Sequence, residues 1–334
     1  MAKITIKDIA KEAGVSISTV SNVLNKRNNK ASKTTIEKIN DVVKKYDYSI
    51  NLNARSMVTH ESGMIGVLYY TEKSEVNFSD PFLSDILTGI EYSSKIHKKF
   101  ILVHGFSDIH DVKSIQQKWR FDGYVVIGAV QAIHDKLTCI IEAPVVFVDT
   151  YLDNKSLKVD YPRYYIYNND FEMSYLATQT LIEHGHHAIA FVSPLLGKQT
   201  AGVVHERFSG YIKALEESDI SYSNHLFFNE DEVAVAVEKS NNYTAILANS
   251  DFLAGELINA WKEYGITDKS IISFDNSFFS EFLEPKLTTI DLAQKEKGKK
   301  AVEVLVGNLE TQKQVKQKFY IQGSLIQRDS VKSL

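Results

Sequence analysis

The stretch ITIKDIAKEAGVSISTVSNVLN (residues 4–25) indicates two short helices joined by a tight turn. The apolar residues of the first helix recur at helical spacing: Ile6, Ile9, Ala10 and Ala13. Gly14 stands where that helix must end. Ser16 is a suitable N-cap for a second helix, which would bury Val20 and Leu24 on one side. The segment is therefore predicted to form a helix-turn-helix.

The opposite side of the second helix carries short side chains: Ile17, Ser18, Ser21 and Asn22. A helix that buries one stripe and offers small polar groups and one short apolar group can enter the major groove of DNA. A helical hairpin with no role in DNA binding is the alternative interpretation.

The N-terminal residues also match a family pattern at many positions: Thr5, Asp8–Ile9–Ala10, Ala13–Gly14–Val15–Ser16, Thr19–Val20–Ser21 and Val23–Leu24–Asn25. With these residues the segment resembles the headpiece of the LacI/GalR family of bacterial transcription regulators. The resemblance implies a repressor that binds a palindromic operator on double-stranded DNA as a homodimer. It also implies control by a small-molecule effector, with no enzymatic activity and no cofactor.

The resemblance assigns roles to individual residues of the headpiece. The DNA-binding positions of the family that fix the register on the phosphate backbone match Ser16, Thr19, Ser21, Asn25 and Ser32, and Thr5 matches a further DNA-binding position. Its base-reading positions match Ile17, Ser18 and Asn22. Because asparagine pairs bidentately with adenine, we predict an A·T pair opposite Asn22 and a thymine methyl near Ile17.

A third helix is predicted from Thr34 or Thr35 to Tyr46, with four apolar residues facing inward: Ile36, Ile39, Val42 and Val43. Residues 1–48 then form a three-helix headpiece. Residues 49–62 are similar to the hinge segment of the family, which becomes helical only on operator DNA. The matching DNA-binding positions are Asn51, Ala54, Arg55 and Met57, with Met57 as the apolar wedge in the minor groove.

Charge is distributed unevenly along the 334 residues. Residues 1–60 contain 11 Lys and Arg against 5 Asp and Glu, a net charge of +6, while the whole chain carries −4. The remainder is therefore strongly acidic. A basic N-terminal segment on an acidic body suggests that only the former meets phosphates. The alternative is that these lysines solvate a small helical domain.

The sequence indicates a cytoplasmic protein without membrane attachment. No stretch of 18 or more residues is apolar, and the N-terminus is polar and contains lysine, unlike a secretory signal. The single cysteine, Cys139, rules out an intrachain disulfide, and its apolar neighbours suggest a core position. The chain ends shortly after LIQRDSV (325–331) without a heptad helix, so we do not expect a tetramer of the lactose-repressor type.

From Gly63 onward, apolar strands alternate with helical segments, which indicates a doubly wound α/β core. The resemblance implies a periplasmic-binding-protein-like core of two such subdomains over residues 63–334. The N-subdomain is expected at about 63–162 and 292–323, and the C-subdomain at about 163–291 and 324–334. The fold class is thus multidomain: a helix-turn-helix headpiece followed by an α/β core.

In such sheets, ligands bind beyond the carboxyl ends of the strands. The resemblance places the effector-binding residues there: Phe82, Asp149, Arg207, Asn249, Asp251 and Asp275. Carboxylates and arginine hold sugar hydroxyls well, so we expect a sugar as the effector and an operon for sugar uptake or catabolism as the target. The alternative is that the aspartates only cap helices. Packing in the core is the alternative for Phe82.

Other effectors and functions remain open. Sugar-binding relatives often carry a tryptophan for which Phe228 would substitute, and a purine, nucleoside or phosphorylated effector would need more cations than Arg207 and Lys198. A solute-binding protein without a regulatory role is a further alternative. The run His184, His186 and His187 is interpreted as packing beside a helix end at Gly185, so no metal site is expected.

Overall fold

The computed structural model describes residues 4–24, 30–48, 61–71, 77–152, 161–194, 202–223, 226–309 and 317–334. The chain divides into two compact units, Met1–Ser62 and Gly63–Leu334, called the headpiece and the core below. Six residues named in the sequence predictions lie outside the described residues: Asn25, Asn51, Ala54, Arg55, Met57 and Lys198.

The headpiece contains the three helices that the sequence predicts. They are α1 (Ile6–Ala13), α2 (Ile17–Leu24) and α3 (Lys33–Lys45). Their fully buried apolar residues form one small cluster: Ile9, Ala10, Val20, Val23 and Ile39. Gly14 has a φ of 67° and ends α1 in the left-handed conformation, as expected from its position.

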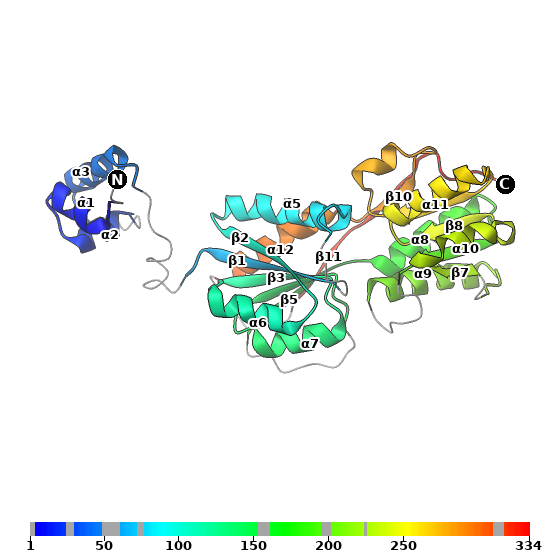
Figure 1. Cartoon of the computed structure of the whole chain (residues 1–334), viewed down its shortest axis with the longest axis horizontal. Helices are drawn as coiled ribbons and strands as arrows, with labels where there is room; N and C mark the ends of the chain where they lie inside the picture. The colour runs from blue at the N-terminus through cyan, green and yellow to red at the C-terminus, as the bar shows by residue number, and fades with distance from the viewer. Residues whose placement is uncertain are drawn as a thin grey trace. The chain divides into compact units, whose positions relative to one another are not determined.

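The core contains two six-stranded sheets among the described residues, and each sheet defines one half of the core (Figure 1). The first half has the spatial order β11 (Gln317–Ile321), β5 (Arg163–Asn168), β4 (Val145–Val148), β3 (Gly123–Ile127), β1 (Met64–Tyr70) and β2 (Phe100–Phe106). The second has the order β12 (Ser324–Ile326), β10 (Thr288–Asp291), β9 (Ser270–Phe274), β8 (Ala245–Ala248), β6 (Ile189–Ser193) and β7 (Phe227–Asn229). Among the described strands, only β12 runs antiparallel to its neighbour.

Helices cover both faces of each sheet, so both halves are doubly wound, as the alternating pattern predicts. In the first half, α5 (Pro81–Ile96) and α12 (Gln294–Leu309) pack on one face, and α6 (Ile109–Lys118) and α7 (Gln131–Ile140) on the other (Figure 1). In the second half, α8 (Asp170–Glu183) and α9 (Val203–Glu217) lie opposite α10 (Val233–Glu238) and α11 (Asp251–Glu263). No described helix is long and apolar enough to cross a membrane.

Two sequence expectations about the core are wrong. The expected boundary at residue 163 is incorrect, because β5 pairs with β4 and β11 in the first sheet and the chain crosses to the second half only after Asn168. The aromatic strand RYYIYN stands between proline and asparagine, and for that reason the sequence pattern did not indicate a strand there. Cys139 is exposed on α7 and does not lie in the core, because its helix turns the neighbouring Leu137 inward.

Glycines allow two helix pairs of the core to touch closely. A Cβ atom at Gly298 of α12 would lie 2.1 Å from the carbonyl oxygen of Ile86 in α5. A Cβ atom at Gly210 of α9 would lie 2.2 Å from the carbonyl oxygen of Phe171 in α8. Each glycine stands within one turn of a buried basic residue, Lys297 or Arg207, and so helps to fix where that cation lies.

Candidate functional site

The start of α2 carries a compact group of exposed hydroxyls. The Oγ of Ser16 accepts the backbone N–H of Thr19 at 3.1 Å, which makes Ser16 the N-cap that the sequence predicts. The same Oγ lies 2.7 Å from the Oγ of Ser18 and 2.8 Å from the Oγ1 of Thr19. No acidic residue lies in the first turn of α2, so the partial positive charge of this helix end is not neutralised there.

The start of α3 repeats this arrangement. The Oγ of Ser32 accepts the backbone N–H of Thr35 at 3.2 Å and lies 2.9 and 2.8 Å from the hydroxyls of Thr34 and Thr35. The start of α1 differs, because Thr5 forms a capping box with Asp8, whose carboxylate accepts the Thr5 hydroxyl at 2.7 Å. Helices α2 and α3 therefore offer neutral hydroxyls and free dipole ends, whereas α1 offers a carboxylate.

The outer face of α2 lacks charged side chains. Ile17 is 45% exposed, and Ser18 is exposed beside it. Asn22 is half-buried, and its side-chain amide has no hydrogen-bond partner among the described residues. Both donors and the acceptor of that amide are thus available to an external group, such as the edge of a base.

A second group of polar residues lies at the carboxyl ends of the strands in the core. Asp149 follows β4 with a φ of 54° and is 8% exposed. Its Oδ2 accepts a hydrogen bond from Nζ of Lys297 at 2.6 Å, while Oδ1 is buried without a partner among the described residues. Burial raises the pKa of Asp149, although the charge of Lys297 opposes this rise.

Arg207, at 5% exposure, is held by polar and aromatic partners of the second half. Its Nε donates to Oδ1 of Asp170 at 2.8 Å, and its Nη1 donates to the carbonyl oxygen of Asn249 at 2.7 Å. The guanidinium carbon lies 4.1 Å from the ring centroid of Phe274, within the range of a cation–π interaction. The structure thus brings the predicted residues Arg207 and Asn249 together.

Asp251 does not have a free carboxylate, contrary to our expectation that it would bind effector. Oδ1 accepts the hydroxyls of Ser273 at 2.5 Å and Thr289 at 2.6 Å. Oδ2 accepts the backbone N–H and the hydroxyl of Ser277 at 2.7 and 2.8 Å. The side chain is fully buried, so it binds neighbouring loops together and offers no oxygen to a ligand.

Asp275, at the end of β9, differs from Asp251 in the hydrogen bonding of its carboxylate. It is half-buried, has a φ of 115°, and its carboxylate has no hydrogen-bond partner among the described residues. Burial raises its pKa well above the ordinary value, and the negative charges of Asp251 and Asp80 add to this rise. Arg207 and Lys297 lower it, so groups from both halves of the core act on this carboxylate.

Phe82 lies beside these groups in the first half. It is half-buried against the core cluster of that half, and Nζ of Lys297 lies 5.7 Å from its ring centroid. Asp80 caps the same helix by accepting the N–H of Phe82 at 3.0 Å. Phe228 is only 2% exposed and belongs to the core cluster of the second half, so it does not replace a ligand-stacking tryptophan as we had considered.

Sequence reasoning missed three residues of this site: Lys297, Asp170 and Tyr151. Lys297 stands in the charged run QKEKGKK, which is typical of a solvated helix, and only the fold shows it 1% exposed. Asp170 looks like an ordinary first-turn acid of α8. The Tyr151 hydroxyl donates to Oδ2 of Asp170, a contact between residues 19 positions apart that no local pattern predicts.

The histidine run has a packing role. His184 ends α8, and Gly185 follows with a φ of 90°. The ring of His186 is buried between the hydroxyl of Thr244 and the carbonyl oxygen of Lys332, both at 2.9 Å. Within the described ranges, no group of three or more His, Cys, Asp or Glu could hold a metal ion.

Two family models match the chain. The model described as bacterial regulatory proteins, lacI family, matches residues 5–51, which include α1, α2 and α3. The model described as a periplasmic binding protein-like domain matches residues 178–331, which include most of the second half and part of the first. The two matches correspond to the headpiece and the core.

Relatives over the whole chain support the same relationship. The HTH-type transcriptional repressors PurR of Vibrio atlanticus and Pasteurella multocida are each 30% identical, with 98–99% of this chain and 99% of the relative covered. The lac repressor dimer bound to operator and the anti-inducer ONPF has a TM-score of 0.80 at 22% identity, covering 99% of both chains. The CelR–cellobiose complex has a TM-score of 0.70 at 19% identity, covering 98% of this chain and 99% of the other.

Proposed function

Because the chain belongs to the lacI family of bacterial regulatory proteins and is a DNA-binding transcriptional repressor, we propose that it represses a sugar operon and responds to a sugar in its core. The family is not one of enzymes. The residues that contact DNA and the identity of the effector are the proposed parts of this function.

The proposed contacts with DNA follow from the exposed groups of the headpiece. The hydroxyls at the starts of α2 and α3, including Ser16, Thr19 and Ser32, would hold two phosphates on neutral donors at helix ends. Thr5 and Ser21 would add contacts with the DNA backbone. The hinge residues Asn51, Ala54, Arg55 and Met57, together with Asn25, are proposed from the family resemblance alone.

Base recognition is proposed for Ile17, Ser18 and Asn22. The observation that carries it is the amide of Asn22, which has no hydrogen-bond partner among the described residues and lies on a helix face without charge. This amide matches adenine N6 and N7, a pairing that contributes about 1–3 kcal/mol of discrimination. Selection from a random DNA library with the full chain should return an A·T pair at that position of each half-site. Selection of a G·C pair there would contradict the assignment, and Asn22→Ala should relax the preference at that position alone.

The proposed effector site lies at the carboxyl ends of the strands. The observation that carries it is the carboxylate of Asp275, which is desolvated and has no donor among the described residues, while Arg207, Lys297 and Asp80 act on it from both halves. Such a carboxylate accepts two hydroxyl groups of a sugar, while Asp149, Asn249 and Phe82 stand near as further contacts. Asp251 is left out of this site for the reason given above.

A purine or nucleoside is the second candidate effector, favoured by the similarity over the whole chain to the HTH-type transcriptional repressors PurR. A phosphorylated effector is less favoured, because Lys297 and Arg207 are already paired with Asp149 and Asp170. The test is a thermal-shift screen of the purified chain with sugars, sugar phosphates, nucleosides and purines. Stabilisation by one sugar, lost in Asp275→Asn, supports the sugar assignment, whereas stabilisation by a purine alone replaces it.

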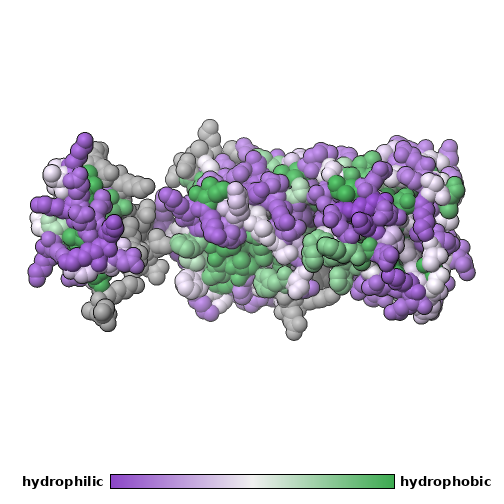
Figure 2. Space-filling model, turned by 90° about the horizontal axis from the view of Figure 1, so that it is seen from above, coloured by the Kyte–Doolittle hydropathy of each residue, from purple (hydrophilic) through white to green (hydrophobic). Residues whose placement is uncertain are grey.

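We propose that the chain acts as a homodimer through apolar surfaces of the core. Apolar and polar side chains both occupy the face in Figure 2, with the apolar ones gathered in patches. Large exposed apolar residues occur in both halves: Tyr92, Ile96 and Phe100 in the first, and Phe252, Phe278 and Phe282 in the second. Sedimentation velocity of Ile96→Glu should show a shift toward monomer, while exposed Lys118→Glu should not.

A solute-binding protein without regulatory role would keep its ligand but would not need the headpiece. Deleting residues 1–62 separates the two functions, because the two units are compact by themselves. We expect loss of DNA binding with retention of ligand-induced thermal stabilisation. Retained DNA binding in the truncated chain would contradict the assignment of the headpiece.

A further inference from the structure

Three segments connect the two halves of the core within the described residues. They are the link from β5 to α8 (168–170), the link from β10 to α12 (291–294) and the link from β11 to β12 (321–324). Any change in the angle between the halves must alter the backbone of these crossovers, because each half is a packed sheet with its own core.

One side chain ties the three crossovers together. Asn168, at the end of β5, is 1% exposed. Its Nδ2 donates to the carbonyl oxygen of Leu292 at 3.0 Å and to that of Ile321 at 2.9 Å. These acceptors lie 124 and 153 positions further along the chain, so this amide joins one crossover to both others. Its Oδ1 is buried without a partner among the described residues, so the donors alone hold the amide in place.

A hydroxyl from the first half reaches the same point. The Tyr151 side chain follows β4, and its hydroxyl lies 2.5 Å from Oδ2 of Asp170 and 2.9 Å from the carbonyl oxygen of Asn168. Burial and the nearby carboxylates of Asp170 and Asp149 raise the pKa of Tyr151 far above its ordinary value. The hydroxyl therefore keeps its proton and remains a donor at all relevant pH values.

The carboxylate of Asp170 is shared between the two halves. One oxygen accepts from Tyr151, while the other accepts from Nε of Arg207 at 2.8 Å. Arg207 in turn donates to the carbonyl oxygen of Asn249 at the end of β8. A continuous chain of hydrogen bonds thus runs from the first half, through the first crossover, to the second half.

We propose that Asn168 and Tyr151 form a latch that holds the two halves of the core in the arrangement described here, and that Arg207 is linked to this latch through Asp170. A ligand that displaces the Arg207 guanidinium would remove one of the two groups that fix the Asp170 carboxylate, and would thereby alter its hydrogen bond with Tyr151. This link to the effector rests on the proposed function, whereas the latch itself depends only on the contacts between the halves.

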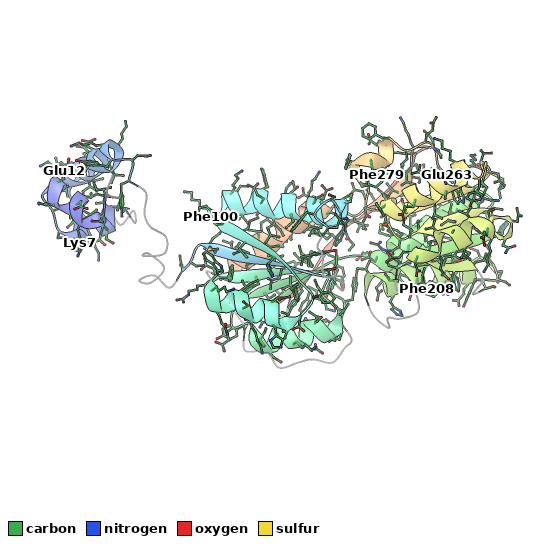
Figure 3. All side chains as sticks on the ribbon, viewed as in Figure 1. Lys7, Glu12, Phe100, Phe208, Glu263 and Phe279 are labelled. Atoms are coloured by element: carbon green, nitrogen blue, oxygen red, sulfur yellow. The ribbon has the colours of Figure 1, made fainter. Side chains whose placement is uncertain are left out.

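The test is Tyr151→Phe, which removes the hydroxyl and keeps the ring. Tyr167→Phe is the matched control, since its ring lies 4.8 Å from that of Tyr151 and its hydroxyl has no hydrogen-bond partner among the described residues. Cys139, the single cysteine, is exposed on α7 of the first half. Glu263 is exposed on α11 of the second half (Figure 3). Glu263→Cys therefore supplies a second labelling position for fluorescence energy transfer between the halves.

Labelled full-length chain is mixed with an excess of unlabelled chain, so that transfer between copies is suppressed. We expect Tyr151→Phe to shift or broaden the transfer distribution relative to the labelled parent, and Tyr167→Phe to leave it unchanged. An unchanged distribution in Tyr151→Phe, or an equal shift in Tyr167→Phe, overturns the latch. No effector is needed, so this outcome is independent of whether the core binds a sugar.

Hydrogen exchange provides a second measurement that a general loss of stability would not reproduce. Losing one net hydrogen bond should speed exchange of the crossover amides by about two- to tenfold, while α5 and α11 keep the parent rates. Asn168→Ala should have a larger effect at all three crossovers, provided that its thermal transition stays cooperative. Uniform acceleration across the core in Tyr151→Phe would contradict the proposal.

Discussion

The headpiece and the core each contain a lysine–carboxylate pair of nearly the same length. In the headpiece, Lys45 lies 2.7 Å from Glu12, with the two side chains 61% and 34% exposed (Figure 3 labels Glu12). In the core, Lys297 lies 2.6 Å from Asp149, with exposures of 1% and 4%. The hydrogen bond from Lys45 lowers the pKa of Glu12, whereas burial raises the pKa of Asp149 despite Lys297.

The two pKa shifts have opposite directions because the carboxylate of the headpiece is exposed to water and the carboxylate of the core is buried. In the headpiece, polar groups stay in water, and their arrangement follows from helix caps and surface positions. In the core, the buried groups Asp149, Arg207 and Asp251 are withdrawn from water, and their partners lie 22 or more positions away in the sequence. The hydroxyls at the starts of α2 and α3 are therefore exposed to an external partner such as DNA, while a change in one of these buried groups of the core affects residues from distant segments of the sequence.

The largest effect on stability is expected from a substitution in the small apolar cluster of the headpiece. Ile9 is fully buried among five such apolar residues, and Ile→Ala in a core costs about 2–5 kcal/mol. Ile9→Ala should unfold the headpiece and abolish DNA binding, because a domain this small is marginally stable. Calorimetry should show the core transition unchanged. The control is Ile17→Ala on exposed α2, which should leave both transitions in place and weaken only specific DNA binding.

The next largest effect compares the two ion pairs directly. Lys297→Met leaves Asp149 buried without its partner, which costs about 3–5 kcal/mol. Lys45→Met breaks a pair of the same length in water and should not measurably change the thermal midpoint. Denaturant unfolding of both variants checks this contrast. Equal losses in the two variants would mean that burial does not distinguish the regions, and Asp149→Asn combined with Lys297→Met should recover part of the lost stability.

Two aspartates of the core extend the comparison of polar groups, because their carboxylates differ in the hydrogen bonds that they accept. Asp251→Asn replaces an acceptor of four hydrogen bonds by an amide that faces hydroxyls and an N–H, so we expect a loss of about 1–3 kcal/mol. Asp275→Asn removes a carboxylate without a protein partner among the described residues and should leave thermal stability equal or higher. Urea unfolding at neutral pH decides between them. A greater loss in Asp275→Asn would reverse the roles assigned to the two residues.

The smallest effect is a pH dependence of stability. The folded-state pKa of Asp275 is raised, so the unfolded chain releases this proton first as the pH rises above about 4. This group therefore destabilises the core progressively above that pH, until the folded pKa is passed. Unfolding free energies measured between pH 4 and neutrality should fall less steeply in Asp275→Asn than in the parent. Parallel curves would show that Asp275 does not titrate as inferred.

Much of the headpiece could be predicted from the sequence. Gly14, Ser16 and the buried Val20 lie where the local pattern placed them, because caps and helical spacing involve residues only a few positions apart. Leu24, predicted as buried, is only partly buried, and Val23 is buried instead. The alternation of strands and helices in the core could also be predicted from the sequence. β5 was missed, since an aromatic run between proline and asparagine lacks the usual strand pattern.

The polar groups of the core could be predicted only in part. Asp149, Arg207, Asn249 and Asp275 do stand at strand ends or beside them, which the sequence could indicate. Asp251 accepts four hydrogen bonds, while the Asp275 carboxylate has no partner among the described residues. This difference could not be foreseen, since both residues follow a strand and carry the same side chain. The difference comes from Ser273, Ser277 and Thr289, which converge on only one of them.

The sequence by itself determined the helix-turn-helix, the doubly wound halves and the membership in a family of repressors, because these depend on local periodicity, caps and matched positions. The tertiary structure alone decided which cations pair with which carboxylates and how the crossovers are tied. Lys297 meets Asp149 across 148 positions, and Asn168 meets Ile321 across 153. Such contacts depend on how sheets and helices pack, and the free energy of a buried charge depends on the partners that packing supplies.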